Sequence, residues 1–206
     1  MRKRLMLILF VALAATAGLG TRAALNSLSP EKRPAYTIVW EATDYYSDGR
    51  VIPNYTETRY VSSTGNWRAV RHYFDGRRSD ESFGEVGRGV YLKRGEKLHF
   101  ISEFTAPPAL LSEQKLRASS AFLRADKVLG YEAIVVSSAN SKSCSEFYRV
   151  PSLGGLTIKT VMCLDETGSK MVLEPVSLVL GEPDVSLLKT LTELPVDCEH
   201  FKQTHP

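Results

Sequence analysis

Short segments of alternating apolar and polar residues, separated by Gly, Pro, Asn and Asp, fill most of this chain and predict an antiparallel β-sheet. The segments are rich in Val, Ile, Thr, Tyr, Phe and Trp, the residues that favour strands. Residues 77–87 are polar and contain glycine, so their pattern predicts a connection without a defined element. In the first half of the chain, strands are expected over residues 36–46, 55–62, 67–74, 89–93 and 97–103.

A different pattern over residues 105–121 predicts the one main helix. Pro107-Pro108 is followed by Leu, Ala, Glu, Gln, Lys and Arg, which are good helix formers, and proline is tolerated in a first turn. The expected helix therefore covers about residues 108–121.

The strand pattern then resumes, and Gly130 interrupts it in a way that suggests a bulge. Pro183-Asp184 predicts the start of a helical turn over 185–191, and the tail from Glu193 is expected to be loose. Further strands are expected over residues 127–138, 145–150, 156–164 and 169–180. Together these elements predict a mainly β (α+β) fold, a strongly curved antiparallel sheet or half-barrel with one main helix packed on one side.

The N-terminus has the pattern of a secretory signal peptide. Arg2, Lys3 and Arg4 precede an apolar run from Leu5 to about Leu19, and small residues follow. The run is shorter than the roughly 20 residues that span a bilayer, which favours cleavage over an uncleaved anchor. Cleavage fits after residue 17 or after residue 23, so we predict a signal peptide over 1–23, a single domain over 24–206 and a periplasmic or secreted location.

Removal of residues 1–23 cancels the apparent basicity of the chain. The full sequence has 26 Lys and Arg against 23 Asp and Glu, a net charge of +3. The first 23 residues hold four basic residues and no acidic one, so 22 basic residues remain against 23 acidic ones. A nearly neutral protein gives no electrostatic reason to expect nucleic acid as a partner. No second long apolar run is present, so no membrane span is expected after cleavage.

Two of the three cysteines fall on one expected hairpin. Directly opposed residues of an antiparallel hairpin have a constant sum of residue numbers, and a tight turn at Leu153-Gly154 sets this sum to 307. That register pairs Cys144 with Cys163, and opposed Cβ atoms lie about 4.5–5.5 Å apart, close to disulfide geometry. In an oxidising compartment we therefore predict a Cys144–Cys163 disulfide with Cys198 free, although a wider turn would shift the register.

No motif for catalysis, metal binding or a cofactor stands out. The sequence lacks H-E-x-x-H, C-x-x-C, G-x-S-x-G and the phosphate-binding glycine loops. Cys198, His200 and His205 form the nearest approach to a metal-ligand cluster, but their spacing matches no usual zinc site. We predict a protein that is not an enzyme and that needs no metal or cofactor.

Aromatic residues concentrate in the first three expected strands. Tyr36, Ile38 and Trp40 share one face of the first strand, and the third strand carries Trp67 and Phe74. Such residues serve either as sheet core and rim or as the wall of an apolar groove. With one helix to cover the sheet, a concave apolar face left partly open would take a lipid or an acyl chain. Tyr36, Ile38, Trp40, Trp67 and Phe74 are therefore the candidate ligand-binding residues.

The C-terminal half carries a pattern of turns and apolar alternation: SEFYRVPSLGGL, TIKTVMCLDETGSK, MVLEPVSLVLGEPD and VSLLKTLTELP. It resembles uncharacterised bacterial secreted proteins similar to the periplasmic lipoprotein-carrier (Lol-type) half-barrel. The resemblance covers roughly residues 36–195 and is best over 144–195. It implies a curved sheet wrapped partly round helices with an apolar cavity, but no binding residue of the family transfers to a numbered position.

These observations favour an exported, non-catalytic binding protein for a lipid, an acyl chain or a lipoprotein-like apolar ligand. The alternative is an envelope protein-interaction or structural module without a small ligand, which would use an exposed sheet edge or the aromatic strands.

Overall fold

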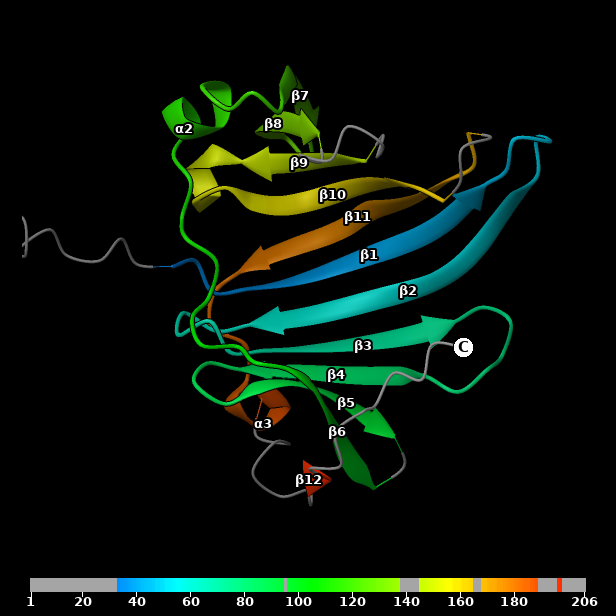
Figure 1. The fold of residues 1–206 in the computed structure, drawn as a ribbon, viewed down its shortest axis with the longest axis vertical. Coiled ribbons are helices and arrows are strands. Elements are labelled where there is room, and N and C mark those ends of the chain that lie inside the picture. The colour runs from blue at the N-terminus through cyan, green and yellow to red at the C-terminus, as the bar shows by residue number, and fades with distance from the viewer. Residues whose placement is uncertain (1–32, 95, 138–144, 165–167, 189–195, 198–206) are drawn as a thin grey trace, which may run out of the picture. The chain divides into compact units, whose positions relative to one another are not determined.

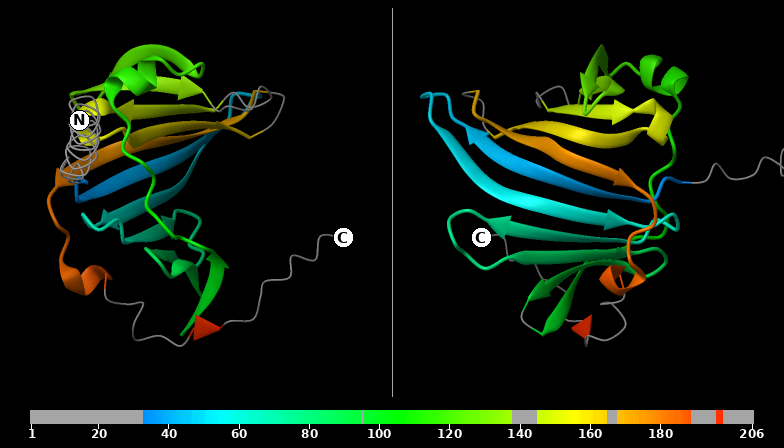
Figure 2. Two further views of the ribbon diagram at one scale, coloured as in Figure 1. Left: turned by 60° about the vertical axis from the view of Figure 1, so that its left-hand side comes forward. Right: turned by 180° about the vertical axis from the view of Figure 1, so that it is seen from behind.

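The strands form one strongly curved sheet, seen in the computed structural model of the chain (Figures 1 and 2). The structure describes residues 33–94, 96–137, 145–164, 168–188 and 196–197. Within them the strand order is β12-β6-β5-β4-β3-β2-β1-β11-β10-β9-β8-β7. All neighbouring strands are antiparallel except the parallel pair of β12 and β6. The predicted mainly β, half-barrel fold is confirmed.

The bounds of the elements are as follows: β1 Tyr36–Tyr45, β2 Val51–Val61, β3 Trp67–Tyr73, β4 Asp80–Glu85, β5 Gly89–Arg94, β6 Lys97–Ser102, α2 Glu113–Arg117, β7 Phe122–Val128, β8 Tyr131–Ser137, β9 Glu146–Val150, the 3-10 turn η1 Pro151–Leu153, β10 Leu156–Cys163, β11 Lys170–Leu180, α3 Val185–Leu188 and β12 Val196–Asp197. Most strands coincide with the segments of alternating hydrophobicity. The turns after β1 and β2 also fall where the sequence predicts them.

The central strands β1, β11 and β10 are irregular, and this irregularity helps to bend the sheet. The register shifts between Val39 and Trp40 on β1 and between Thr157 and Lys159 on β10. Such bulges increase the local twist and leave a backbone group unpaired. The indole Nε1 of Trp40 donates a 2.5 Å hydrogen bond to the carbonyl of Ile158, the residue at the β10 bulge. Trp40 thus crosses the intervening β11 and fastens the two irregular strands together.

The prediction of a long helix over residues 108–121 is wrong. Only Glu113–Arg117 are helical, in α2, which Ser112 caps by accepting from the backbone N–H of Lys115. Residues 103–112, which we call the strap, run across the end of the sheet where β1 begins (Figure 1). An extended chain advances about 3.3 Å per residue against 1.5 Å in a helix, so the distance from β6 to α2 favours an extended strap.

Two strands and one turn differ from the pattern in the sequence. Residues 80–85 form β4, although their polar and glycine content concealed the alternation. Residues 122–128 form β7, although no element was predicted for residues 122–126 and a strand was expected only from residue 127. Gly130 has a φ of 81° and forms, with Leu129, the tight turn between β7 and β8 rather than a bulge within one strand. Of the expected turn over 185–191, Val185–Leu188 are helical and the rest lies outside the described residues.

The hairpin of β9 and β10 follows the predicted register at the end away from its turn. Its turn is wider than the two residues expected, because η1 and the two glycines Gly154 and Gly155 intervene. The bulge at Ile158 compensates for this, so that Tyr148 pairs with Lys159 and Glu146 pairs with Val161. Both pairs have the sum of 307 that the sequence predicts. Cys163 ends β10, whereas Cys144, Cys198 and the signal segment lie outside the described residues.

The disulfide remains a prediction, and the register supports it. The sum of 307 that the sequence assigns to Cys144 and Cys163 is the sum found for the pair Glu146 and Val161. A non-reduced proteolytic digest of protein secreted into an oxidising compartment should contain a peptide that joins Cys144 to Cys163, detectable by mass spectrometry. A peptide that joins Cys198 to either residue would contradict the prediction.

Gly84 supports the indole of Trp67 from the neighbouring strand. The two residues are directly opposed, and a Cβ at position 84 would lie 2.1 Å from Nε1 of Trp67. We predict that Gly84→Ala displaces the indole and lowers the free energy of unfolding by about 1–3 kcal/mol, as overpacking does. Urea unfolding followed by tryptophan fluorescence measures this. Ser82→Ala, on the same strand and the same face, should change the stability by less than about 0.5 kcal/mol, and an equal loss would contradict the explanation.

Candidate functional site: a cavity between the sheet and the strap

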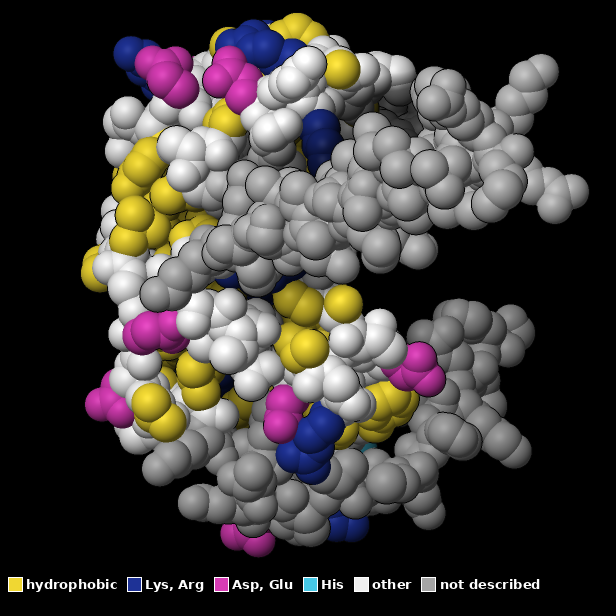
Figure 3. Space-filling view, turned by 90° about the vertical axis from the view of Figure 1, so that its left-hand side faces the viewer, with side chains coloured by type: hydrophobic (Ala, Val, Ile, Leu, Met, Phe, Trp, Pro, Cys, Tyr) yellow, Lys and Arg dark blue, Asp and Glu magenta, His cyan; other side chains and the backbone are white. Residues whose placement is uncertain are grey.

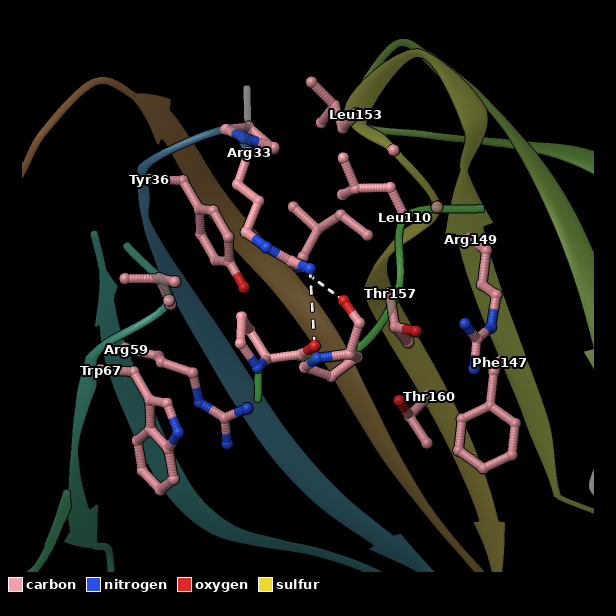
Figure 4. A pocket seen from close by; sticks show the side chains of 18 of the residues that line it. Arg33, Tyr36, Arg59, Trp67, Leu110, Phe147, Arg149, Leu153, Thr157 and Thr160 are labelled. Atoms are coloured by element: carbon pink, nitrogen blue, oxygen red, sulfur yellow. Dashed lines mark hydrogen bonds between the residues drawn. The ribbon is translucent and has the colours of Figure 1, made fainter. Parts of the chain in front are cut away.

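A cavity of about 570 Å³ lies between the inner face of the sheet and the strap (Figure 4). Side chains of six strands point towards it, and the strap closes it at the end where β1 begins. Its lining comprises Arg33, Pro34, Tyr36, Trp40, Glu57, Arg59, Val61, Ser62, Gly65, Trp67, Phe104, Pro107, Pro108, Ala109, Leu110, Phe147, Arg149, Leu153, Gly154, Gly155, Leu156, Thr157, Thr160, Met162 and Leu173. Most of these residues are apolar or aromatic, so the cavity is a site for a mainly apolar group.

Three of the five predicted ligand-binding residues line this cavity. Tyr36, Trp40 and Trp67 come from β1 and β3 and belong to its wall. Ile38 lies between Tyr36 and Trp40 on the same face, but it is completely buried in the core and does not border the cavity. Phe74 follows the end of β3 and is 56% exposed, away from the cavity. That these residues bind a ligand stays a prediction, and for Ile38 and Phe74 the geometry does not support it.

The strap is held by glycines on the turns at this end of the sheet. The carbonyl of Phe104 accepts a hydrogen bond from the N–H of Gly87, and the N–H of Leu111 donates one to the carbonyl of Gly154, each at 2.8 Å. Between these bonds the strap packs so closely that a Cβ on Gly65 would lie 2.7 Å from Pro107. A space-filling view onto this end shows hydrophobic side chains among the described residues (Figure 3). Close packing on both sides therefore fixes the strap over the cavity.

Arg33 forms the third attachment of the strap. Its guanidinium donates to the carbonyls of Pro108 and Pro107, at 2.5 and 3.4 Å (Figure 4). Proline has no N–H, and a strap in this conformation leaves its carbonyls available for a side-chain donor. Arg33 thus links the chain just before β1 to the middle of the strap.

Glu57 is the carboxylate of the cavity lining, and it is 1% exposed. One oxygen accepts from Arg59 and the other from Arg71, both at 2.6 Å. Burial of a single carboxylate is costly without such partners. Arg59 also lies 5.3 Å from the ring centroids of both Trp40 and Trp67, which places its cation between two aromatic faces. This group gives the cavity one rigid polar wall.

Arg149 is a further cation of the lining, and it differs from Arg59. Within the described part of the chain, no carboxylate pairs with its guanidinium, and its buried Nε has no hydrogen-bond partner. Burial lowers the pKa of Arg149, and no neighbouring charge opposes that effect. Burial also raises the pKa of the phenol of Tyr36, while the charge of Arg59 acts in the opposite direction, so Tyr36 is neutral at neutral pH.

The sequence pattern alone did not identify the strap, Glu57 or the arginines of the lining. A usable signal was present, since Arg59 lies directly opposite Ile38 and so faces the same side as the candidate aromatics. The pairing of β9 and β10 gives the corresponding signal for Arg149, which lies opposite Thr157. The strap has no such signal, because its contacts are made with glycines of distant turns.

The described residues contain no group of three or more His, Cys, Asp or Glu placed to hold a metal ion. His72 instead makes a 2.8 Å hydrogen bond to Ser79 on an exposed surface. The tail cluster with Cys198, His200 and His205 lies outside the described residues.

Among the described residues, no helix has the length and hydropathy needed to cross a bilayer.

No protein-family model matches the sequence, and neither does any curated protein. Among solved structures, similarity extends to a LolA superfamily protein from Nitrosomonas europaea, with 9% identity, a TM-score of 0.40 and coverage of 77% of this chain and 90% of that one. PNGF-II shows 13% identity and a TM-score of 0.39 over 80% of this chain, but only 31% of its own chain is covered. An outer membrane lipoprotein-sorting protein domain from Vibrio parahaemolyticus shows 12% identity and a TM-score of 0.34 over 76% of this chain and 90% of its own.

Two of these solved structures are thus described as a LolA superfamily protein and a lipoprotein-sorting protein domain. At these low TM-scores the similarity carries no argument about function, which has to come from the cavity itself.

The pairing of Glu57 with two arginines makes a testable contribution to stability. We predict that Glu57→Ala lowers the free energy of unfolding by about 2–3 kcal/mol, because it leaves two cations without their carboxylate. Chemical denaturation of the purified variant measures this. Glu113→Ala removes a carboxylate from the exposed pair with Arg117 on α2 and should cost less than about 1 kcal/mol. Equal losses in the two variants would contradict a special role for Glu57.

Proposed function

We propose that this chain is an exported, non-catalytic binding protein that holds a lipid, an acyl chain or a similar apolar ligand in the cavity under the strap. The observation that carries the proposal is the cavity of about 570 Å³ with a mainly apolar lining. Sites for small molecules typically enclose about 300–1,000 Å³ and combine an apolar wall with a few placed polar groups. The aromatic residues, Leu110 of the strap and the polar wall of Glu57 and Arg59 fit this description.

The chemistry of the lining favours binding over catalysis. Glu57 is 1% exposed and each of its oxygens already accepts a hydrogen bond from an arginine, so it is poorly placed to exchange protons with a ligand. Thr157 and Thr160 supply hydroxyl groups on β10. Their neighbours in the lining are mainly apolar, a setting suited to holding a chain rather than cleaving it.

The N-terminal pattern supports the exported location. A basic start, a short apolar run and small residues over 1–23 are what a periplasmic or secreted protein needs for export. A carrier of an apolar ligand has its use in an aqueous compartment such as the periplasm, where a free acyl chain is poorly soluble.

Binding should depend on the length of an uncharged chain. We predict that delipidated protein binds n-alkanols from octanol to dodecanol with an affinity that rises about fourfold per methylene, the value expected for about 0.8 kcal/mol per buried CH₂. Displacement of the uncharged fluorescent probe N-phenyl-1-naphthylamine measures the affinities. An affinity independent of chain length would contradict binding in an apolar cavity.

Filling the cavity should abolish this binding. Thr160 lines the cavity, and Thr160→Trp places an indole in the space that the chain would occupy. Thr58→Trp is the matched control, because Thr58 is half-buried on β2 and lies between Glu57 and Arg59 in sequence, so it points to the opposite face. We expect at least a tenfold loss for the first variant and less than a twofold change for the second. Absence of alkanol binding, with capture of an envelope protein by the wild type, would support the interaction module instead.

A further inference from the structure

The cavity lining contains more positive than negative side chains, and its arginines differ in whether they have a partner. Three arginines, Arg33, Arg59 and Arg149, accompany the single carboxylate of Glu57. That carboxylate is shared between Arg59 and Arg71, which lies next to the cavity on β3. Arg33 uses its guanidinium on the strap carbonyls. Arg149 is therefore the lining cation that is left without a compensating group.

The unpaired nitrogen of Arg149 is not a general feature of this sheet's arginines. The Nε atoms of Arg59 and Arg68 are also buried without a hydrogen bond, but each of these side chains makes an ion pair, with Glu57 and Glu81 respectively. Arg149 has the same orphaned Nε and, within the described residues, no ion pair at all. An uncompensated, partly buried cation costs stability, and such groups concentrate at functional sites.

The surroundings of Arg149 suit the head of an amphiphile. Arg149 lies on β9 between Ile134 of β8 and Thr157 of β10, its direct partners in the register. Phe147 lies two residues earlier on the same face, and Figure 4 shows Arg149 across the cavity from Arg59 and Trp67. One side of the cavity thus offers a guanidinium and the hydroxyls of Thr157 and Thr160. Apart from the paired Glu57 and Arg59 and from Arg33, which is bound to the strap, the rest of the lining is mainly apolar and aromatic.

We propose that the ligand is an amphiphile with a single anionic head, a carboxylate or a phosphate monoester, and that Arg149 binds this head while the acyl chain occupies the apolar part of the cavity. This inference rests on the proposed function and specifies its ligand class. A planar guanidinium presents parallel N–H donors to a carboxylate or phosphate, which matches the two oxygens of such a head. Thr157 is the nearest hydroxyl in the register and is placed to donate to the same head.

The test compares ligands with the same chain and different heads. Dodecanol, dodecanoate, dodecyl phosphate and dodecyltrimethylammonium are titrated against the delipidated full-length mature protein by probe displacement. The wild type should bind dodecanoate and dodecyl phosphate at least about tenfold more tightly than dodecanol, because charge-assisted hydrogen bonds are added to the same apolar contact. The cationic amphiphile should bind more weakly than dodecanol.

Variants then locate the head. Arg149→Met keeps most of the side-chain length and should remove the tenfold advantage of the anions while it leaves the affinity for dodecanol within twofold. Arg149→Lys should keep part of the advantage, since it keeps the charge but not the paired donors. Arg117→Met is the control for net charge, because Arg117 pairs with Glu113 on the exposed side of α2, and it should change neither affinity.

Each other outcome overturns the proposal in a recognisable way. If dodecanol binds and the anions show no advantage, the cavity is a lipid site but Arg149 does not select the head. If Arg149→Met weakens all ligands equally, the residue acts by packing. If millimolar inorganic phosphate blocks dodecanoate as strongly as dodecyl phosphate does, the site takes a free anion rather than an amphiphile. If no amphiphile binds the wild type, the proposed function fails together with this inference.

Discussion

The inner face of the sheet is larger than the helical material that the described chain provides to cover it. In a compact domain, a β-sheet buries at least one of its faces against another layer of secondary structure. Here the covering layer consists of α2, with five residues, and the extended strap over residues 103–112. A short helix and a single extended segment cannot fill a wide concave surface. The cavity follows from this shortage, and its position behind the strap follows from where the strap is anchored.

The strap can approach the turns of the sheet closely because the turn residues that it contacts are glycines, which have no side chain. The strap meets Gly65 near its middle and the pair Gly154 and Gly155 near its second end, where a Cβ would collide with Pro107, Leu110 or Leu111. These glycines also have positive φ values, which ordinary residues adopt only with strain. The same residues therefore shape the turns of the sheet and admit the strap. A substitution that added a Cβ or excluded a positive φ at these glycines would therefore move the strap, which is a wall of the cavity, as well as the turn.

The sequence predicts strands where burial alternates along one element, because alternation is a local property. It locates β1 and the hairpin of β5 and β6. The register that it predicts for β10 from a tight turn holds beyond Ile158, because the wider turn and the bulge, neither of which it predicts, compensate for each other. It fails over residues 108–112, where helix propensity is outweighed by contacts with distant glycines, and it assigns no strand to residues 122–126, which belong to β7 and pair with β8. The sequence already suggests that Tyr36 and Trp40, on one face of β1, and Trp67 on β3 could line a groove. Phe74 shares a face with Val70 and not with Trp67, so alternation along the strand already directs it away from the cavity face.

The polar groups of the cavity make sense only when they are considered together. Glu57 pairs with both Arg59 and Arg71, one negative charge against two positive ones, and this group lies beside the aromatic wall. If every cation of the lining were satisfied in this way, an uncharged chain would be the best occupant. Arg149 departs from the pattern, because its position on β9 directs it to the same cavity without a carboxylate among the described residues. A cavity that is apolar over most of its surface and carries one cation without an ion pair or a hydrogen bond to the strap offers two chemically different environments, and a molecule with two different ends matches it better than a simple hydrocarbon does.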